Sequence, residues 1–490
     1  MSPSAIVWAD PSIPDSGPTV DPSSITPPDL LSGSANPQTQ EAPSIPNFAD
    51  VLNQVPADLP SAPTTPDVPS SGPSSGSLEG PASGTTPPDT KAELHTTTLD
   101  LAVDAKVTKE TNIYGQAVTG VAVDAIKLEQ AFSEQIETVI IEINGTDPVV
   151  KVDLPTNALL LAVSKQPYAM VHIKAGGVSY RLPVSVFKNL PKNTAVNVTI
   201  SKLTDTNSVE INSKIEQEGF KPLLDQPVDF TVSINGEVVT DFHGTYIDRT
   251  MSLKSLTDSS KATAVWIDDK NKMNFIPSVI ATKNGSVEVT IHSPHNSIYT
   301  VVQSNKSFTD MQGHWAKPDV EYLANKMIVN GITDKNFGPD NYITRADFAA
   351  LLVRSMGLAE VNSDLLFKDV QAEDWYAGAV GAAQKAGIIA GYEDGTFKPE
   401  AMISREQMVL MIIRAMKVVG KEIKANPSVL IKFSDQASIS DWAKDAVSES
   451  LSIGVIQGIT EKTFAAQDQA TRAQAVAVLK RVLQYLEFVN

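Results

Sequence analysis

The alternation of apolar and polar residues is clearest between residues 227 and 242, "PVDFTVSINGEVVTDF". Phe230, Val232 and Ile234 point to one face of a strand, because successive side chains of a strand alternate between faces. Asn235-Gly236 then supplies the residue pair typical of a two-residue hairpin turn, and Val238 begins a return strand. The pattern therefore predicts a β-hairpin in this stretch.

Residues 93–305 contain several more segments of this kind. "IATKNGSVEVTIHS" predicts a second hairpin around Asn284-Gly285, and further strands are expected in "TVIIEING", "AMVHIKAGGVSYRLPVSVF" and "AVNVTISKL". The segment 125–137, "AIKLEQAFSEQIE", is expected to be helical. Many short strands separated by turn residues predict a β-rich region of one or two domains, resembling an Ig-like β-sandwich.

From residue 306 onward the apolar residues follow a helical period, and one pattern occurs three times. Each copy starts with Phe-x-Asp and a Trp, and its second helix starts at "TRADFAALLVRSM", "SREQMVLMIIRAM" or "TRAQAVAVLKRVL". The three Trp each precede an Arg by thirty residues, in the pairs Trp315 and Arg345, Trp375 and Arg405, and Trp442 and Arg472. The constant spacing predicts three copies of one helical unit, at 306–362, 363–427 and 428–490.

Composition separates a third region, residues 1–92, from the rest of the chain. Nineteen of the 32 prolines lie in the first 90 residues, interleaved with Ser, Thr, Gly and Asp. Such a segment buries too little apolar surface to offset the entropy of ordering it. The predicted fold class is therefore multidomain, with a disordered linker, a β-sandwich-like middle and an all-α C-terminal triplet.

Charge and residue usage exclude several classes of function. The net charge is −18, and residues 1–90 carry ten acidic residues and no Lys or Arg, which argues against nucleic-acid binding. The absence of cysteine excludes disulfides and thiolate metal sites. The longest apolar runs, such as "ALLLAV", are too short to cross a bilayer, so no membrane insertion is expected. The start, "MSPSAIVWADPS", lacks a signal peptide, so either the chain is not exported or Met1 is not its native start.

The repeated unit resembles the S-layer homology family over about 180 residues at the C-terminus. The resemblance rests on Phe-x-Asp, the three Trp, the glycines Gly331, Gly391 and Gly458, and the Thr-Arg-Ala-like helix starts. It implies helix-loop-helix modules packed as a pseudo-threefold spindle on the wall of a Gram-positive bacterium. Grooves between the modules would bind an anionic secondary cell-wall polysaccharide, often bearing a pyruvate ketal. The β-rich region looks similar to segments that precede such modules in extracellular proteins of Paenibacillus-like bacteria.

The start of the second helix in each copy has a predicted N-cap residue followed by an arginine. Thr344, Ser404 and Thr471 are predicted N-caps, completed by Asp347, Gln407 and Gln474 as capping boxes. The arginines that follow them occupy the first helical position, where the helix dipole disfavours a cation. A carboxylate bound to the free N–H groups and the guanidinium would explain the recurrence. The alternative is an ion pair within the protein, for example with Asp310.

The remaining positions of the repeat have a structural and a functional interpretation. The Trp side chains are expected to be half-buried, packing on the core while one face lines a groove and stacks on a sugar ring. The glycines are expected to end the first helix in a left-handed turn, and the Asp of Phe-x-Asp to cap the loop before that helix. Ala466 replaces a proline of the other copies, so the groove of the third copy is expected to bind more weakly or to be purely structural. The predicted ligand-binding residues are Trp315, Arg345, Trp375, Arg405, Trp442, Arg472, Gly331 and Gly391.

No catalytic, cofactor or metal-binding pattern is found in the sequence. The first functional interpretation is a non-catalytic cell-surface protein, anchored by its modules and able to self-associate in a surface layer. The second is the anchoring part of an exported carbohydrate-active enzyme whose catalytic domain lies upstream. A third makes the β-rich region a glycan-binding module, which exposed aromatic residues on one sheet face would indicate.

Overall fold

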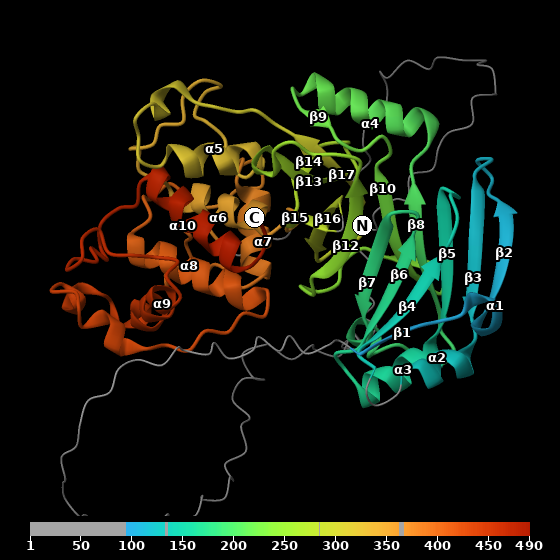
Figure 1. Ribbon diagram of the computed structural model, residues 1–490. Coiled ribbons are helices and arrows are strands. Elements are labelled where there is room, and N and C mark those ends of the chain that lie inside the picture. Colours follow the sequence, from blue (N-terminus) through green and yellow to red (C-terminus); the bar gives the residue numbers. More distant parts are fainter. Residues whose placement is uncertain (1–94, 133–135, 284, 362–366) are drawn as a thin grey trace, which may run out of the picture. The chain divides into compact units, whose positions relative to one another are not determined.

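The computed structural model describes residues 95–132, 136–283, 285–361 and 367–490. The predicted linker, residues 1–92, lies outside the described residues. The chain from Asp89 to Asn490 forms one compact unit, in which a β-rich part is followed by a helical part (Figure 1).

The strands of the described residues form two sheets. The seven-stranded sheet has the order β1 (Thr96–Thr98), β4 (Thr138–Ile143), β6 (Met170–Ala175), β7 (Val178–Pro183), β12 (Ile247–Leu253), β16 (Ser286–Ser293) and β15 (Ser278–Lys283). The ten-stranded sheet runs β14 (Met273–Phe275), β13 (Ala262–Ile267), β17 (Ile298–Gln303), β10 (Val228–Ile234), β8 (Ala195–Lys202), β5 (Val149–Pro155), β3 (Ala117–Val123) and β2 (Ala105–Thr111), with β11 (Glu237–Val239) on β10 and β9 (Lys221–Pro222) on β17.

The sheets bury a common core. Alternating residues of both, such as Val171 and Ile173 of β6 and Val198 of β8, belong to one hydrophobic cluster. Tyr180 of β7 and Phe230 of β10 meet edge to face, with ring centroids 5.2 Å apart. Edge-to-face packing adds about 0.5–1.5 kcal/mol to the area that two aromatic rings bury. The alternation seen in the sequence is therefore the division between this core and the outer sheet faces.

Two features of strand pairing bear on the predictions. Both hairpins are confirmed: Ile234 pairs with Glu237 across a turn in which Asn235 and Gly236 have positive φ, and Lys283 pairs with Ser286. Three pairs, however, are parallel: β1 with β4, β4 with β6, and β3 with β5. An Ig-like sandwich consists of antiparallel sheets, so the Ig-like part of the prediction is wrong. Parallel neighbours need long crossover connections, which periodicity within single strands does not reveal.

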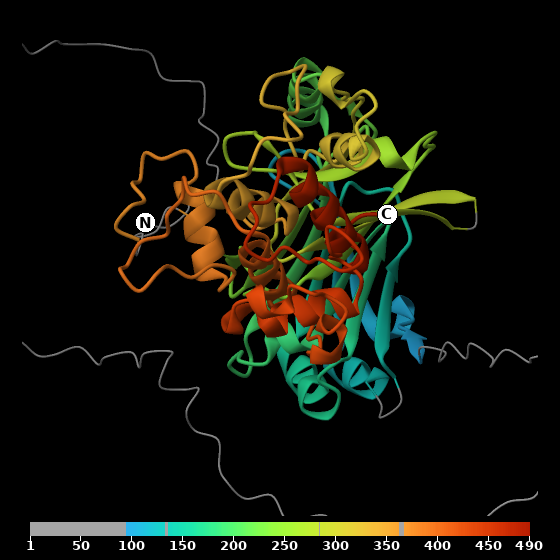
Figure 2. The same ribbon diagram turned by 90° about the vertical axis from the view of Figure 1, so that its left-hand side faces the viewer.

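The helices of the β-rich part connect strands. They are α1 (Leu101–Asp104), α2 (Ala125–Ala131), α3 (Thr156–Lys165) and α4 (Asp205–Gln217), with the short 3-10 turns η1 (Val184–Phe187) and η2 (Ser259–Lys261). The helix expected at 125–137 is α2, although it ends at Ala131, before strand β4. Helices α2 and α3 lie together at one end of the strands, and α4 lies at the opposite end (Figures 1 and 2).

The C-terminal part is helical, as predicted. Its elements are η3 (Thr309–Met311), α5 (Lys317–Asn325), α6 (Arg345–Ser355), α7 (Ala377–Lys385), α8 (Arg405–Val418), η4 (Pro427–Leu430), η5 (Gln436–Ser438), α9 (Asp441–Ser452) and α10 (Arg472–Tyr485). Each copy of the repeat thus supplies two helices, α5 and α6, α7 and α8, or α9 and α10. These copies are called modules 1, 2 and 3 below.

The three modules are joined by a closed ring of backbone hydrogen bonds. Ile343 N donates to Ala470 O at 3.1 Å, Ala470 N to Ile403 O at 3.0 Å, and Ile403 N to Ile343 O at 3.0 Å. Each of these residues directly precedes an N-cap residue. The ring therefore brings the starts of α6, α8 and α10 together at one place.

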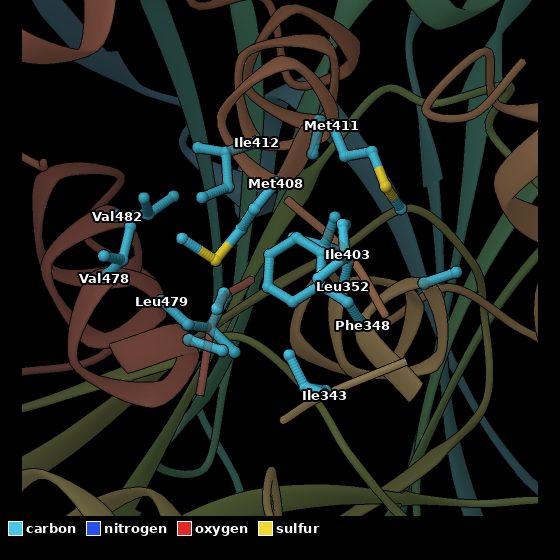
Figure 3. Packing of buried hydrophobic residues seen from close by; sticks show 14 of the residues in the cluster. Ile343, Phe348, Leu352, Ile403, Met408, Met411, Ile412, Val478, Leu479 and Val482 are labelled. Atoms are coloured by element: carbon cyan, nitrogen blue, oxygen red, sulfur yellow. The ribbon is translucent and has the colours of Figure 1, made fainter. Parts of the chain in front are cut away.

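Behind this ring the same three helices share an apolar core. Phe348 and Leu352 of α6, Met408 and Ile412 of α8, and Leu479 of α10 point toward one another (Figure 3). These side chains are at most 1% exposed. Burying one such side chain is worth about 1.5–3 kcal/mol, so the modules stabilise one another through this core.

The helical part also contacts the β-rich part. Lys326 at the end of α5 is buried, and its Nζ donates to Ser259 O at 2.8 Å and to Ala262 O. Burial lowers the pKa of this lysine to about 7, partly offset by the charge of Asp258. Tyr246 Oη donates to Met356 O at 2.6 Å.

Candidate functional site

The predicted N-caps are confirmed. Thr344, Ser404 and Thr471 each accept a hydrogen bond from the third residue of the helix, whose side chain binds back to the cap residue. All three helices therefore start with a capping box, including the one completed by an Asp rather than a Gln. Caps of this kind are worth about 1 kcal/mol each and depend only on neighbouring residues.

The first two N–H groups of each helix donate to the next module. Arg345 N donates to Ala401 O at 2.9 Å and Ala346 N to Pro399 O at 3.0 Å. The same contacts recur from α8 to the loop of module 3 and from α10 to the loop of module 1. With the third N–H held by the cap, the expectation of free N–H groups that meet an anion is wrong. The carbonyl groups that accept from these N–H groups belong to another module, so the sequence of one repeat does not reveal them.

The arginine side chains reach into the same loops. Arg345 Nε donates to Phe397 O at 2.9 Å, Arg405 Nε to Phe464 O at 3.1 Å, and Arg472 Nε to Phe337 O at 3.1 Å. Each guanidinium also lies over the ring of that phenylalanine, with Cζ 4.6–5.2 Å from the ring centroid. A cation over an aromatic face is favourable by about 0.5–2 kcal/mol. The arginines therefore link neighbouring modules.

The second contact of each guanidinium differs among the modules. Arg405 Nη2 donates to Gln457 O at 2.9 Å and Arg472 Nη2 to Asn330 O at 2.8 Å, whereas Arg345 Nη1 lies 3.4 Å from Gln407 Oε1. Burial lowers the pKa of all three groups, which nevertheless remain cationic.

An ion pair within the protein was the alternative explanation of these arginines. Within the described ranges, none of the three guanidiniums lies within 4 Å of a carboxylate oxygen. Asp310 instead accepts hydrogen bonds from Phe337 N at 2.9 Å and Gly338 N at 2.7 Å. Asp369 and Asp435 do the same in their modules. The Asp of Phe-x-Asp thus holds the loop before the second helix, not the loop before the first.

One groove, of about 690 Å³, receives residues from all three modules. Arg345 comes from module 1, the loop from Gly391 to Lys398 from module 2, and Trp442 from module 3. Tyr392 of that loop lies between two cations, with its ring centroid 5.0 Å from Arg345 Cζ and 4.0 Å from Lys398 Nζ. We call this the Arg345 groove.

A second groove, of about 290 Å³, repeats the arrangement with the modules permuted. Arg472 comes from module 3, Gly331 from module 1 and Trp375 from module 2. Asp347 and Arg354 complete its lining. We call this the Arg472 groove. Two grooves built from an arginine, a glycine loop and a tryptophan of three different modules are what a cyclic arrangement of the repeat produces.

The tryptophans are more exposed than their position at a helix start suggested. Trp315, Trp375 and Trp442 are 60%, 63% and 52% exposed. An indole that is this accessible adds little to the core, so its ring face is available for contact with a ligand.

The glycines act differently from the prediction. Gly331, Gly391 and Gly458 do not have positive φ; the left-handed residues that end the first helices are Met327, Gly387 and Gly454. A Cβ on Gly391 would lie 2.5 Å from the ring of Phe367 and 2.8 Å from Thr396 O. These glycines therefore allow the loop to pack against the phenylalanine of Phe-x-Asp. In the third module the carbonyl of Ala466 still accepts from Glu406 N at 3.1 Å, so this bond survives the loss of proline.

Sequence reasoning missed a second cation in both grooves. Arg414 lines the Arg345 groove and Arg354 the Arg472 groove, and each follows the first arginine of its helix by nine residues. Arg354 Nη1 donates to Ile328 O at 2.9 Å, whereas Arg414 has no hydrogen-bond partner in the part of the chain that the structure describes. The constant register in the repeat was the signal that would have identified them.

Comparison with known families supports the identity of the repeat. The model of the S-layer homology domain matches residues 307–349, 366–409 and 432–476. Each match covers a first helix, its loop and the start of a second helix.

Relatives with this part in common include enzymes and surface proteins. The chain is 32% identical to the amylopullulanase of Thermoanaerobacterium thermosulfurigenes over 53% of its length, 14% of the relative. It is 37% identical to the exoglucanase XynX of Acetivibrio thermocellus over 38% of its length, 17% of the relative. It is 30% identical to a cellulosome-anchoring protein of Acetivibrio thermocellus over 30% of its length, a third (33%) of the relative. The match to the amylopullulanase spans 264 residues, which is more than the chain contains from residue 307 to its end. The match therefore extends into the β-rich part.

Among the helices of the described residues, none has both the length and the hydrophobicity needed to cross a bilayer.

Proposed function

Because the C-terminal part of the chain carries three S-layer homology domains, we propose that it anchors an extracellular protein non-covalently to a bacterial cell wall by binding an anionic secondary cell-wall polysaccharide. Domains of this family attach proteins to cell-wall polymers and are not themselves catalytic. The family and relatives named for surface layers support a location outside the cell, at the cell surface. The polymer, its charge and the Gram-positive host are the finer parts of the proposal.

The observation that carries the proposal is the composition of the Arg345 groove. A sugar ring has an apolar face that packs on an indole, which Trp442 offers, and hydroxyl groups that hydrogen-bond to Gln407 and Tyr392. A pyruvate ketal adds a carboxylate, which a guanidinium binds through two parallel hydrogen bonds. All N–H donors of Arg414 are available to bind such a carboxylate, whereas the Nε–H of Arg345 already donates to Phe397 O.

In this proposal each part of the chain has a mechanical role. The three modules act as a pseudo-threefold spindle, with Trp375 and Trp442 lining the two grooves described above and Trp315 exposed in module 1. The two sheets act as a sandwich-like spacer, and residues 1–92 act as a linker. The chain itself performs no catalysis and uses no cofactor.

Sedimentation of the full chain with purified cell-wall sacculi tests the proposal. We expect the chain to co-sediment with sacculi, and to remain in solution when the secondary polymer or its pyruvate groups have been removed. Trp375→Ala combined with Trp442→Ala should weaken binding about tenfold, corresponding to a loss of about 1.4 kcal/mol. Equal sedimentation with treated and untreated sacculi would contradict the proposal.

A matched control separates a groove effect from a general loss of aromatic surface. Tyr168 is 90% exposed on the β-rich part, so Tyr168→Ala removes an even more accessible ring elsewhere. We expect Tyr168→Ala to bind sacculi like the unchanged chain. All variants should keep the unfolding midpoint, because these side chains are exposed.

The matches to glycosidases favour a second candidate function. The chain covers 14% of the amylopullulanase and 17% of the exoglucanase, so it corresponds to a small part of each enzyme. We propose as the alternative that it is the anchoring part of an exported carbohydrate-active enzyme. The reading frame upstream of Met1 decides between the two, because a catalytic domain there supports the alternative and an export signal the first proposal.

Relatives named S-layer protein also raise the question of self-association. If the chain builds a surface layer, purified protein should form ordered sheets visible by electron microscopy. Soluble monomers at millimolar concentration would argue for anchoring alone.

A further inference from the structure

We propose that the outer face of the seven-stranded sheet carries a second binding groove, which takes a polysaccharide bearing carboxylates. The observation is a hollow of about 700 Å³ over β4, β6, β7, β12, β15 and β16. It lies on the face opposite the common core, because the residues that line it alternate along each strand with buried apolar ones. In β7, for example, Ser179 and Arg181 line the hollow, and Tyr180 between them is fully buried.

Strand register explains the shape of the hollow. One row across the sheet consists of short hydroxyl side chains, Ser179, Thr250 and Thr290, which are direct neighbours on β7, β12 and β16. The adjacent row contains the larger side chains of His172 and Arg181 on β6 and β7, followed by Asp248 on β12. A floor of short residues beside a wall of larger ones makes a groove that crosses the strands.

Three basic residues (Lys174, Arg181 and Lys283) and three acidic residues (Glu142, Asp248 and Glu288) line the groove, but they are not all paired with one another. Asp248 is engaged by His292 Nδ1 at 2.8 Å, and Glu288 by Lys283 Nζ at 3.4 Å. Lys174 and Arg181, in contrast, form no ion pair or hydrogen bond within the described part of the chain, and Arg181 Nε is buried without an acceptor. A buried donor without a partner costs about 1–3 kcal/mol, so an acceptor that enters the groove is favoured.

The acidic register neighbours of this pair form no ion pair with it. Glu142 is opposite Lys174 on β4 and β6, and Asp248 is opposite Arg181 on β12 and β7, yet within the described residues neither pair of charged groups lies within 4 Å. His172 neighbours both cations, two residues before Lys174 on β6 and opposite Arg181 on β7, and its pKa is lowered to about 4, first by burial and then by Lys174 and Arg181. It is therefore a neutral hydrogen-bonding group at physiological pH.

The chemistry of these groups selects the ligand. Arg181 and Lys174 match a carboxylate, and the row of Ser and Thr hydroxyls matches the hydroxyl groups of a sugar chain. The residues that line the groove include no Phe, Tyr or Trp. Recognition would therefore depend on hydrogen bonds and charge rather than stacking, and it should weaken as salt is added.

Affinity electrophoresis of the full chain tests the proposal, with polygalacturonate as the acidic probe and dextran as the neutral one. We expect polygalacturonate to retard the chain, dextran to have no effect, and 0.5 M NaCl to abolish the retardation. Arg181→Gln with Lys174→Gln should weaken binding at least tenfold. Absence of retardation, or equal retardation by dextran, would overturn the proposal.

Control variants separate this groove from other effects. Lys106→Gln with Lys151→Gln removes two exposed lysines from the ten-stranded sheet and should bind like the unchanged chain. Trp375→Ala with Trp442→Ala, which removes the rings from the grooves between modules, tells the sites apart: loss of polygalacturonate binding in this variant, with binding kept in the Arg181 and Lys174 variant, would overturn the proposal. Should the Arg181 and Lys174 variant unfold, Thr250→Gln fills the floor without removing a cation and should weaken binding to a similar extent.

Discussion

Replacing Arg405 by alanine measures how far the arginine of the helix start holds the modules together. Arg405 is 4% exposed, and its guanidinium donates to Phe464 O and Gln457 O and lies over the Phe464 ring. Each carbonyl left without a donor costs about 1–3 kcal/mol, and the lost contact with the ring about 0.5–2 kcal/mol. Removing a cation from the positive end of the helix dipole returns about 0.3–1 kcal/mol. The expected net loss of unfolding free energy is about 3 kcal/mol.

Urea unfolding followed by far-ultraviolet circular dichroism is the assay for this prediction. Arg481→Ala is the matched control, because Arg481 has the same register in α10 as Arg414 in α8 and forms no hydrogen bond among the described residues. Its replacement should change stability by less than about 0.5 kcal/mol. A loss below 1 kcal/mol for Arg405→Ala, or equal losses for both variants, would refute a linking role.

The remaining predictions concern a loop, a groove and a buried lysine. Gly391→Ala should lower the unfolding free energy by about 2–4 kcal/mol, because the added Cβ would clash with the Phe367 ring and a backbone carbonyl. The control is Gly387→Ala, for which a loss of roughly 1 kcal/mol is expected in the same urea unfolding experiment. A loss for Gly391→Ala that is no larger than that of the control would contradict the close packing at Gly391. Arg414→Gln should weaken sedimentation with sacculi about tenfold without changing stability, and unchanged binding would exclude Arg414 from the ligand site. The pKa of Lys326 is about 7 in the folded chain and near 10.4 unfolded, so the unfolded state binds more protons between these values. Stability relative to Lys326→Met should therefore rise with pH from 7 to 10, by at most ~1.4 kcal/mol per pH unit, in urea titrations of both proteins; a flat or falling difference would refute the charge burial.

The local features of the fold were predictable because they depend on neighbours in the sequence. The capping boxes at Thr344, Ser404 and Thr471 involve residues three positions apart, and the hairpin at Asn235-Gly236 depends on two residues that tolerate positive φ. The threefold repeat was visible as a constant spacing. These interactions form within a few residues, so the sequence shows both partners.

What the tertiary structure decided is which distant groups meet. The partners of Arg345 N and Nε belong to module 2, and Trp442 reaches the same groove from module 3, although nearly a hundred residues separate it from Arg345. The parallel strand pairs, the packing of Gly391 on Phe367, and the groove beside Arg181 likewise depend on how separate segments pack. A local pattern specifies which face of an element is apolar, but it does not specify which other element covers that face. For this reason the elements and the repeat followed from the sequence, whereas the way in which residues of different modules combine in one groove followed only from the fold.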